Sequence, residues 1–278
     1  MTTNDDVPLA QPVFGERALL LPQASTIVVG DLHIGLETHL RQAGVNIPSQ
    51  TQRMRERLAK LLHDTLARRI IVIGDLKHRI PRSTQQEAIE LPWFFHGLGT
   101  DSVELVRGNH DVDLQGLIDI KVHDAGGIRV GDVALLHGHE WPTEEIIQDA
   151  RVVVTCHNHP AVMLVDALGH RHKEACWVRA RFTQAAQERY DRLRPDTEFI
   201  VMPAFNELTG GTAINAPEGG RLLGPLFGNG LIDIENARLW TVDGVDLGTV
   251  KSLRKYGGEE KAPRKPRMFG RKKRPGDG

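Results

Sequence analysis

The chain has 278 residues, of which 40% are hydrophobic and 26% are charged, a composition typical of a soluble globular protein. It has no run near the roughly 18 apolar residues that a membrane span needs, no basic start followed by an apolar segment, and only two cysteines. These features argue against a membrane protein, a secreted protein and a disulfide-rich scaffold, and they favour the reducing cytoplasm.

The formal net charge of −1 conceals an uneven distribution. Residues 251–278 contain eleven Lys and Arg against three acids, a net charge of +8, so residues 1–250 carry −9. The same segment has Gly and Pro but no apolar periodicity. We therefore predict a folded domain over residues 1–250 and a disordered basic tail over 251–278. Such a tail is either a solvated segment that aids solubility or an arm that binds nucleic acid by releasing counterions.

The first half of the chain alternates between short apolar runs and amphipathic segments. Buried strands are expected at residues 26–30, 70–74 and 103–106. Helices are expected between them, at residues 49–69 and 83–97. Ser49 is the predicted N-cap of the first helix, Ser83 or Thr84 that of the second, and Pro92 must break or kink the second. This alternation predicts a parallel sheet covered by helices.

Beyond residue 115 the expected strands are more antiparallel. A hairpin is expected over 128–136, turning at Gly131 and Asp132. The other expected strands lie at residues 152–154, 162–165, 174–182, 198–202 and 231–240, with a short helix at 183–193. We therefore predict a mixed α/β fold in which two mixed β-sheets pack face to face, with flanking helices.

Side chains that can bind a metal follow five of these apolar runs. They are Asp31 with His33, then Asp75, then Asn109 with His110 and Asp111, then His137 with His139, and finally His157 with His159. Because the carboxyl ends of strands in an open α/β sheet line the ligand crevice, we expect these groups to converge. A single Asp or His in such a place is usually a turn, cap or other polar residue, but five such strand ends favour one site.

The chemistry of these residues suits a pair of metal ions. Asp31 and His33 are two residues apart in an extended segment, so both can face one ion, and the Asp75 carboxylate can bridge two. Mixed nitrogen and oxygen ligands favour Mn²⁺, Fe, Zn²⁺ or Ni²⁺ over Ca²⁺. Two such ions would clamp a phosphate and activate a water for in-line attack.

The same residues make the sequence similar to a known family. It resembles the calcineurin-like metallophosphoesterases, whose blocks are Asp-x-His, Gly-Asp, Gly-Asn-His-Asp/Glu, His and Gly-His-x-His. The resemblance spans residues 25–160, and "GDLKH", "RGNHD" and "MPAFNELTGGTAIN" are similar to the ICC-like branch of archaea and bacteria. Cys156 stands where the family usually has Gly. A thiol there could make the site sensitive to oxidation.

The resemblance implies a role for each residue. The first ion would be bound by Asp31, His33 and His159, and the second by Asn109, His137 and His157, with Asp75 between them. His110 would protonate the leaving oxygen or stabilise the transition-state charge. Asp111 would orient His110. Mn²⁺ is the metal that we expect first.

Four further residues are weaker candidates for contact with substrate. Lys77 and His78 follow the bridging acid and either meet the substrate phosphate or cap the next element. Arg107 has the same two alternatives. His139 is expected to support the metal ligands, but it competes with His137 for the ligand role.

Our leading hypothesis is a di-metal phosphoester hydrolase, more specifically a phosphodiesterase or nuclease that acts on nucleic acid or nucleotides. Some bacterial members of the ICC-like branch are associated with DNA ligase and helicase repair proteins, which implies a role in DNA repair with such partners. A phosphomonoesterase or a small cyclic-nucleotide phosphodiesterase is the alternative that the acidic residues 1–250 favour. A metal-bound scaffold without turnover is the third possibility, and the complete set of blocks, including His110, argues against it.

Overall fold

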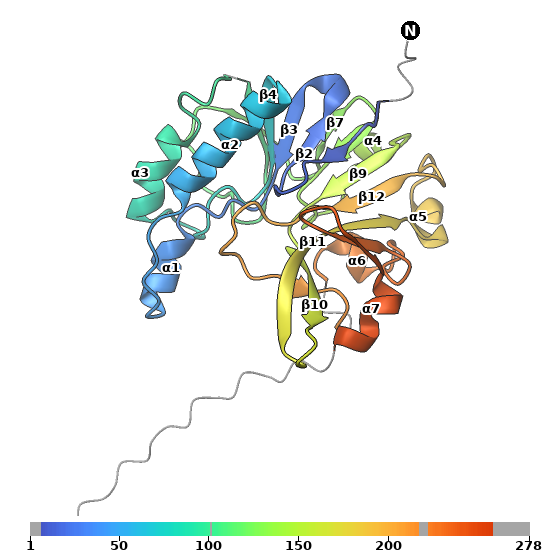
Figure 1. Ribbon diagram of the computed structural model, residues 1–278. Helices are drawn as coiled ribbons and strands as arrows, with labels where there is room; N and C mark the ends of the chain where they lie inside the picture. The colour runs from blue at the N-terminus through green and yellow to red at the C-terminus, as the bar shows by residue number, and fades with distance from the viewer. Residues whose placement is uncertain (1–6, 101, 217–221, 258–278) are drawn as a thin grey trace, which may run out of the picture.

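The computed structural model describes residues 7–100, 102–216 and 222–257. Two mixed β-sheets lie face to face, and helices flank them (Figure 1). The predicted fold class is therefore confirmed. Within the described ranges, no helix is both long and apolar enough to cross a membrane.

The first sheet has six strands in the order β1-β2-β3-β4-β5-β6. Their bounds are β1 Gln11–Pro12, β2 Leu19–Leu21, β3 Thr26–Val29, β4 Arg69–Ile73, β5 Val103–Val106 and β6 Lys121–His123. The strands β1, β2 and β3 pair antiparallel, whereas β3 to β6 run parallel. The parallel part brings the ends of β3, β4 and β5 to one edge of the sheet.

The second sheet has nine strands, seven of them in the order β13-β10-β11-β12-β9-β8-β7, and β14 joins β11 to β15. Their bounds are β7 Ile128–Val130, β8 Val133–Leu135, β9 Val152–Thr155, β10 Pro160–Val165, β11 Arg171–Arg181, β12 Glu198–Val201, β13 Thr212–Ala213, β14 Arg238–Thr241 and β15 Asp246–Thr249. Parallel pairing joins β8 to β9 and β9 to β12, and most of the other pairs are antiparallel. The hairpin predicted to turn at Gly131 is confirmed.

Alternation along the strands explains the layers, because successive side chains of a strand point to opposite faces. On β3, Ile27 and Val29 pack towards the helices, and Val28 packs between the sheets. On β9, Val152 and Val154 point to the first sheet, and Val153 belongs to the core on the outer side of the second sheet. Three apolar layers therefore hold the two sheets and the helices together.

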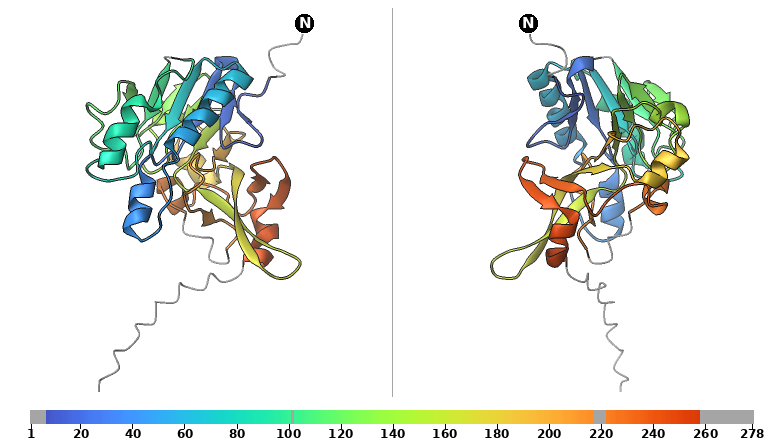
Figure 2. Two further views of the ribbon diagram at one scale, coloured as in Figure 1. Left: turned by 60° about the vertical axis from the view of Figure 1, so that its left-hand side comes forward. Right: turned by 90° about the vertical axis from the view of Figure 1, so that its right-hand side faces the viewer.

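Three helices accompany the first sheet: α1 Leu36–Gln42, α2 Thr51–Thr65 and α3 Gln85–Phe94. Thr84 caps α3 and forms a capping box with Glu87, which confirms one of the two predicted caps. The helix α2 is shorter than predicted, because Gln50 is its N-cap and Leu66 ends it in the left-handed conformation with φ of 55°. The helix α1 was not predicted, and it projects beyond the carboxyl end of β3 (Figure 2).

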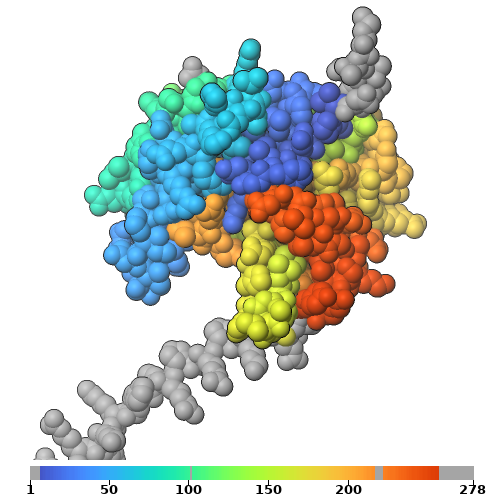
Figure 3. Space-filling view, viewed as in Figure 1, coloured from blue at the N-terminus to red at the C-terminus, as the bar shows by residue number. Residues whose placement is uncertain are grey.

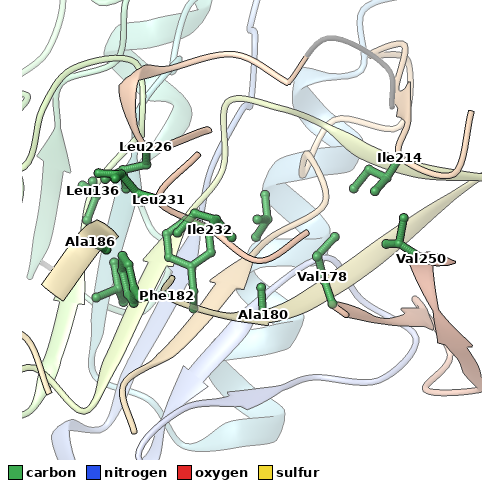
Figure 4. Packing of buried hydrophobic residues seen from close by; sticks show 14 of the residues in the cluster. Leu136, Val178, Ala180, Phe182, Ala186, Ile214, Leu226, Leu231, Ile232 and Val250 are labelled. Atoms are coloured by element: carbon green, nitrogen blue, oxygen red, sulfur yellow. The ribbon is translucent and has the colours of Figure 1, made fainter. Parts of the chain in front are cut away.

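The late helices are α4 Glu144–Ile147, α5 Gln184–Arg189, α6 Pro225–Gly228 and α7 Val250–Gly257. The helix α7 corrects the predicted boundary at residue 250, because Leu253 is 8% exposed and Val250 packs into the core that Figure 4 shows. Residues 251–257 therefore belong to the folded domain, and the rest of the predicted tail, 258–278, lies outside the described residues. The predicted strand over 231–240 is also wrong for most of its length, since β14 begins at Arg238 and Ile232 forms only an isolated bridge.

Candidate metal centre

The turns that follow β3 and β4 continue side by side after the strands end. The Asp31 N–H donates to the carbonyl of Gly74 over 3.0 Å, and the His33 N–H donates to that of Asp75 over 2.9 Å. The side chains that were predicted to share one site are therefore held on adjacent, hydrogen-bonded backbones.

Five of the predicted metal ligands have a backbone conformation that side chains disfavour. Their φ angles are 55° at Asp31, 44° at His33, 52° at Asp75, 64° at His157 and 41° at His159. Non-glycine residues rarely adopt this left-handed region, and such outliers concentrate at functional sites. These turns therefore orient the ligand side chains at a cost in folding free energy.

The first ligand group consists of Asp31, His33 and His159. The His159 Nε2 lies 3.3 Å from His33 Nε2 and 3.4 Å from Asp31 Oδ1. Asp31 Oδ2 accepts from the N–H of His157 at 3.0 Å, but its buried Oδ1 has no hydrogen-bond partner among the residues that the structure describes. A buried carboxylate oxygen without a donor is what a site built for a cation presents.

The second ligand group gathers around His137. Its Nε2 lies 3.1 Å from Asn109 Oδ1 and 3.4 Å from Asp75 Oδ2. The ligand atoms of Asp75, His137 and His157 all lie within 4.8 Å of one another. Asp75 Oδ2 is also 3.6 Å from His33 Nε2, so this carboxylate lies between the two groups, as a bridging ligand must.

Backbone carbonyls orient two of the imidazoles. The Nδ1 of His137 donates to the carbonyl of Ile73 at 3.0 Å, and that of His159 donates to the carbonyl of Gly210 at 3.1 Å. In the neutral form of both rings the proton is therefore on Nδ1, which leaves Nε2 as the nitrogen that can bind a cation.

Close packing around the ligands leaves no room for a side chain at two glycine positions. A Cβ on Gly74 would lie 2.3 Å from His137 Nδ1, and one on Gly108 would lie 2.3 Å from the backbone nitrogen of Asp75. Any side chain at either position would push a metal ligand out of place.

Burial favours the neutral form of His33 and His157, whereas a neighbouring carboxylate favours the charged form of His137. Burial lowers the pKa of His33 to about 3 and that of His157 to about 4. Burial also opposes the charge of His137, but the hydrogen bond and charge of Asp75 outweigh it and raise the pKa of His137 to about 9. A metal must therefore displace a proton from His137.

These residues fit two divalent cations. Two carboxylates, one amide oxygen and four imidazoles form two ligand groups that share Asp75, and this donor set suits Mn²⁺, Fe, Zn²⁺ or Ni²⁺. The structure thus brings together all seven predicted ligands: Asp31, His33, Asp75, Asn109, His137, His157 and His159.

The predicted acid, His110, lies beside the ligand groups. Its Nε2 is 3.9 Å from Asp75 Oδ2, and its Nδ1 donates to the carbonyl of His78. The expected partner, Asp111, points elsewhere: its carboxylate accepts from the N–H of Leu76 at 2.8 Å and of Gly108 at 2.9 Å. These contacts correct the prediction that Asp111 orients His110, because Asp111 holds the backbone turn and His78 supplies the contact to the ring.

The weaker candidates have different surroundings. Lys77 is fully buried, and its ammonium donates to the carbonyl of Arg79, which favours a structural role over the other alternative, contact with the substrate phosphate. His78 is half-buried, with its ring stacked 5.5 Å from that of His110. Arg107 is exposed and lines a pocket that includes Asp111.

His139 and Cys156 support His137. The ring of His139 lies 5.1 Å from that of His137, but it is His137 whose nitrogen faces Asn109 and Asp75. The fully buried thiol of Cys156 donates to the carbonyl of Ile73 at 2.7 Å, and burial raises its pKa. This thiol is therefore shielded from oxidants, contrary to the sensitivity that the sequence suggested.

The segment after β12 also supports the site. The Asn206 side chain donates to the carbonyl of Leu32 at 2.9 Å, and Gly210 orients His159. The motif "AFNELTGG" was the only sequence signal for these contacts.

The centre opens towards solvent between two projections. His159 directly precedes β10, and the His39 ring of α1 is 5.3 Å from the ring of His78. Figure 3 shows a hollow between α1 and the hairpin of β10 and β11.

One family model and two solved structures match this chain. The family model described as "Calcineurin-like phosphoesterase" matches residues 24–212. The structure is similar to that of Pseudomonas putida nuclease MPE, with a TM-score of 0.52 and 21% identity over 83% of this chain and 89% of that one. A second structure, the E. coli phosphoesterase Yfce, matches with a TM-score of 0.32 and 20% identity over 53% of this chain and 76% of that one. A comparison with curated protein sequences gave no match.

Proposed function

The chain belongs to the calcineurin-like phosphoesterase family, and on this premise we propose that it is a di-metal phosphodiesterase that cleaves nucleic acid or nucleotides. The observation that carries the proposal is the pair of ligand groups that share Asp75, with His110 beside them. When bound, two divalent cations, with Mn²⁺ as our first choice, would neutralise the phosphate and activate a water for attack.

The chain's own residues supply the rest of the chemistry. His110 keeps a proton on Nδ1 through the carbonyl of His78, so Nε2 is the nitrogen that faces the ligand groups. Because Nδ1 is protonated, Nε2 carries a proton only in the imidazolium form of His110, and that proton is positioned for the oxygen that leaves when the phosphoester bond breaks. Proton donation of this kind contributes about 10²–10⁴-fold when the leaving group is poor. A diester of nucleic acid has such a leaving group.

One observation supports a polyanionic substrate. Residues 258–278 contain eight Lys and Arg against three acids, a net charge of +5. A role in DNA repair, alongside a DNA ligase or helicase, is part of the proposal and depends on the resemblance to the ICC-like branch.

The test compares hydrolysis of bis-p-nitrophenyl phosphate with that of p-nitrophenyl phosphate in the presence of Mn²⁺. We expect faster turnover of the diester, loss of turnover after chelation, and recovery when Mn²⁺ is returned. Faster turnover of the monoester would favour a phosphomonoesterase. Metal binding without turnover of either ester would favour a scaffold.

A further inference from the structure

Glu87 makes contacts that its place in a helix cap does not explain. It is the third residue of α3, and in the capping box one of its oxygens accepts from the N–H of Thr84 while its own N–H donates to Thr84 Oγ1 at 3.2 Å. A capping box needs no more than this, and such residues are normally near solvent. Glu87 is instead completely buried.

The other carboxylate oxygen of Glu87 holds the turn after β4. Its Oε1 accepts from the N–H of His78 at 3.0 Å and from that of Arg79 at 2.6 Å. The same side chain packs on the turn after β3, since a Cβ on Gly35 would lie 2.6 Å from Glu87 Cγ. The Glu87 side chain therefore joins α3 to the turn after β4 by hydrogen bonds and packs against the turn after β3.

Residue 78 connects this carboxylate to the active site. Its carbonyl accepts the proton of His110 Nδ1, and its own Nδ1 lies 3.4 Å from His33 Nδ1. Displacing the peptide of residue 78 would therefore move the partner that determines which nitrogen of His110 faces the ligand groups.

We propose that Glu87 is a positioning residue for His110, acting through the backbone of His78 and Arg79. This inference rests on the proposed function, because it assumes that His110 donates a proton. Glu87 itself does not touch the ligand groups. Its removal should therefore misplace His110 and leave the metal-binding residues in place.

The test uses Glu87→Ala, Glu87→Gln and Thr84→Ala, each with Mn²⁺. Thr84→Ala is the matched control, since it removes the other side chain of the same capping box and leaves the contact to residues 78 and 79 intact. We expect Glu87→Ala to slow a dinucleotide diester by about 10- to 100-fold and an activated nitrophenyl ester much less. Glu87→Gln keeps one acceptor oxygen and should restore most of the rate. Thr84→Ala should lower the melting temperature but leave both rates within about twofold.

A double variant separates positioning from general loss of structure. In a His110→Ala background, Glu87→Ala should cost no more than about twofold on the diester, because the residue that it positions is already gone. Full additivity of the two losses, equal slowing of both esters, or loss of metal from Glu87→Ala would overturn the inference. If His110→Ala alone slows the diester and the activated ester equally, the role of His110 in the proposed function fails instead. This result distinguishes failure of the proposed function from failure of the inference about Glu87.

Discussion

Replacement of the shared ligand should abolish both metal binding and turnover. Asp75→Asn keeps the shape of the side chain but removes its charge, and Asp75 Oδ2 lies 3.4 Å from His137 Nε2 and 3.6 Å from His33 Nε2. At an effective dielectric constant of about 20, two unit charges about 4 Å apart interact by about 4 kcal/mol. Loss of that interaction corresponds to about a thousandfold in affinity, and a divalent ion would lose more.

The assay measures metal content by elemental analysis and turnover of bis-p-nitrophenyl phosphate at increasing Mn²⁺. Asp113→Asn is the matched control, because Asp113 is an exposed acid close to the site in sequence and undergoes the same chemical change. We expect the control to behave as the unchanged protein. Two bound equivalents and full turnover in Asp75→Asn would refute the shared-ligand interpretation.

Four further outcomes are expected. The variant His110→Ala should retain two metal equivalents, and its rate should fall by about 10²–10⁴-fold on a natural diester but far less on an activated monoester. Loss of a metal from this variant would mean that His110 is a ligand. Deletion of 258–278 should leave turnover of a small diester unchanged and flatten the salt dependence of DNA binding; an unchanged slope would exclude a nucleic-acid arm. Leu253→Ala should lower the free energy of unfolding in urea by about 2–3 kcal/mol without changing kcat, and a tolerated change would mean that α7 is dispensable. Metal must displace the proton of His137, whose pKa is about 9. The affinity for Mn²⁺ should therefore rise by up to about tenfold per pH unit between about pH 7 and 9. Calorimetry in two buffers should detect the release of this proton.

The metal ligands could be predicted because each follows a short apolar run, and this pattern depends only on local sequence. Convergence then follows from the geometry of parallel strands, and the distances around Asp75 agree with it. The orientation of His110 could not be predicted in this way. The adjacent Asp111 was the natural guess, but its carboxylate binds backbone amides of two turns whose approach is a long-range feature.

The errors at the element boundaries also have physical causes. The end of α2 at Leu66 depends on a left-handed residue with no Gly or Asn to signal it. The helix α7 was missed because its many charges hide the apolar pair of Val250 and Leu253, which is buried only against the distant second sheet. Glu87 carried a visible capping signature, Thr84-x-x-Glu87, but its second set of contacts crosses to another turn.

The left-handed ligands have a consequence for how this protein can evolve. Each such residue costs about 1 kcal/mol or more of folding free energy, and the five together are comparable to a large part of the stability of an ordinary domain. Glycine accepts this conformation without strain, so replacing His157 or His159 by Gly should make the metal-free protein more resistant to unfolding and leave it inactive. Selection for stability alone would therefore erode the site, and intact ligands at these positions require continued selection for the reaction.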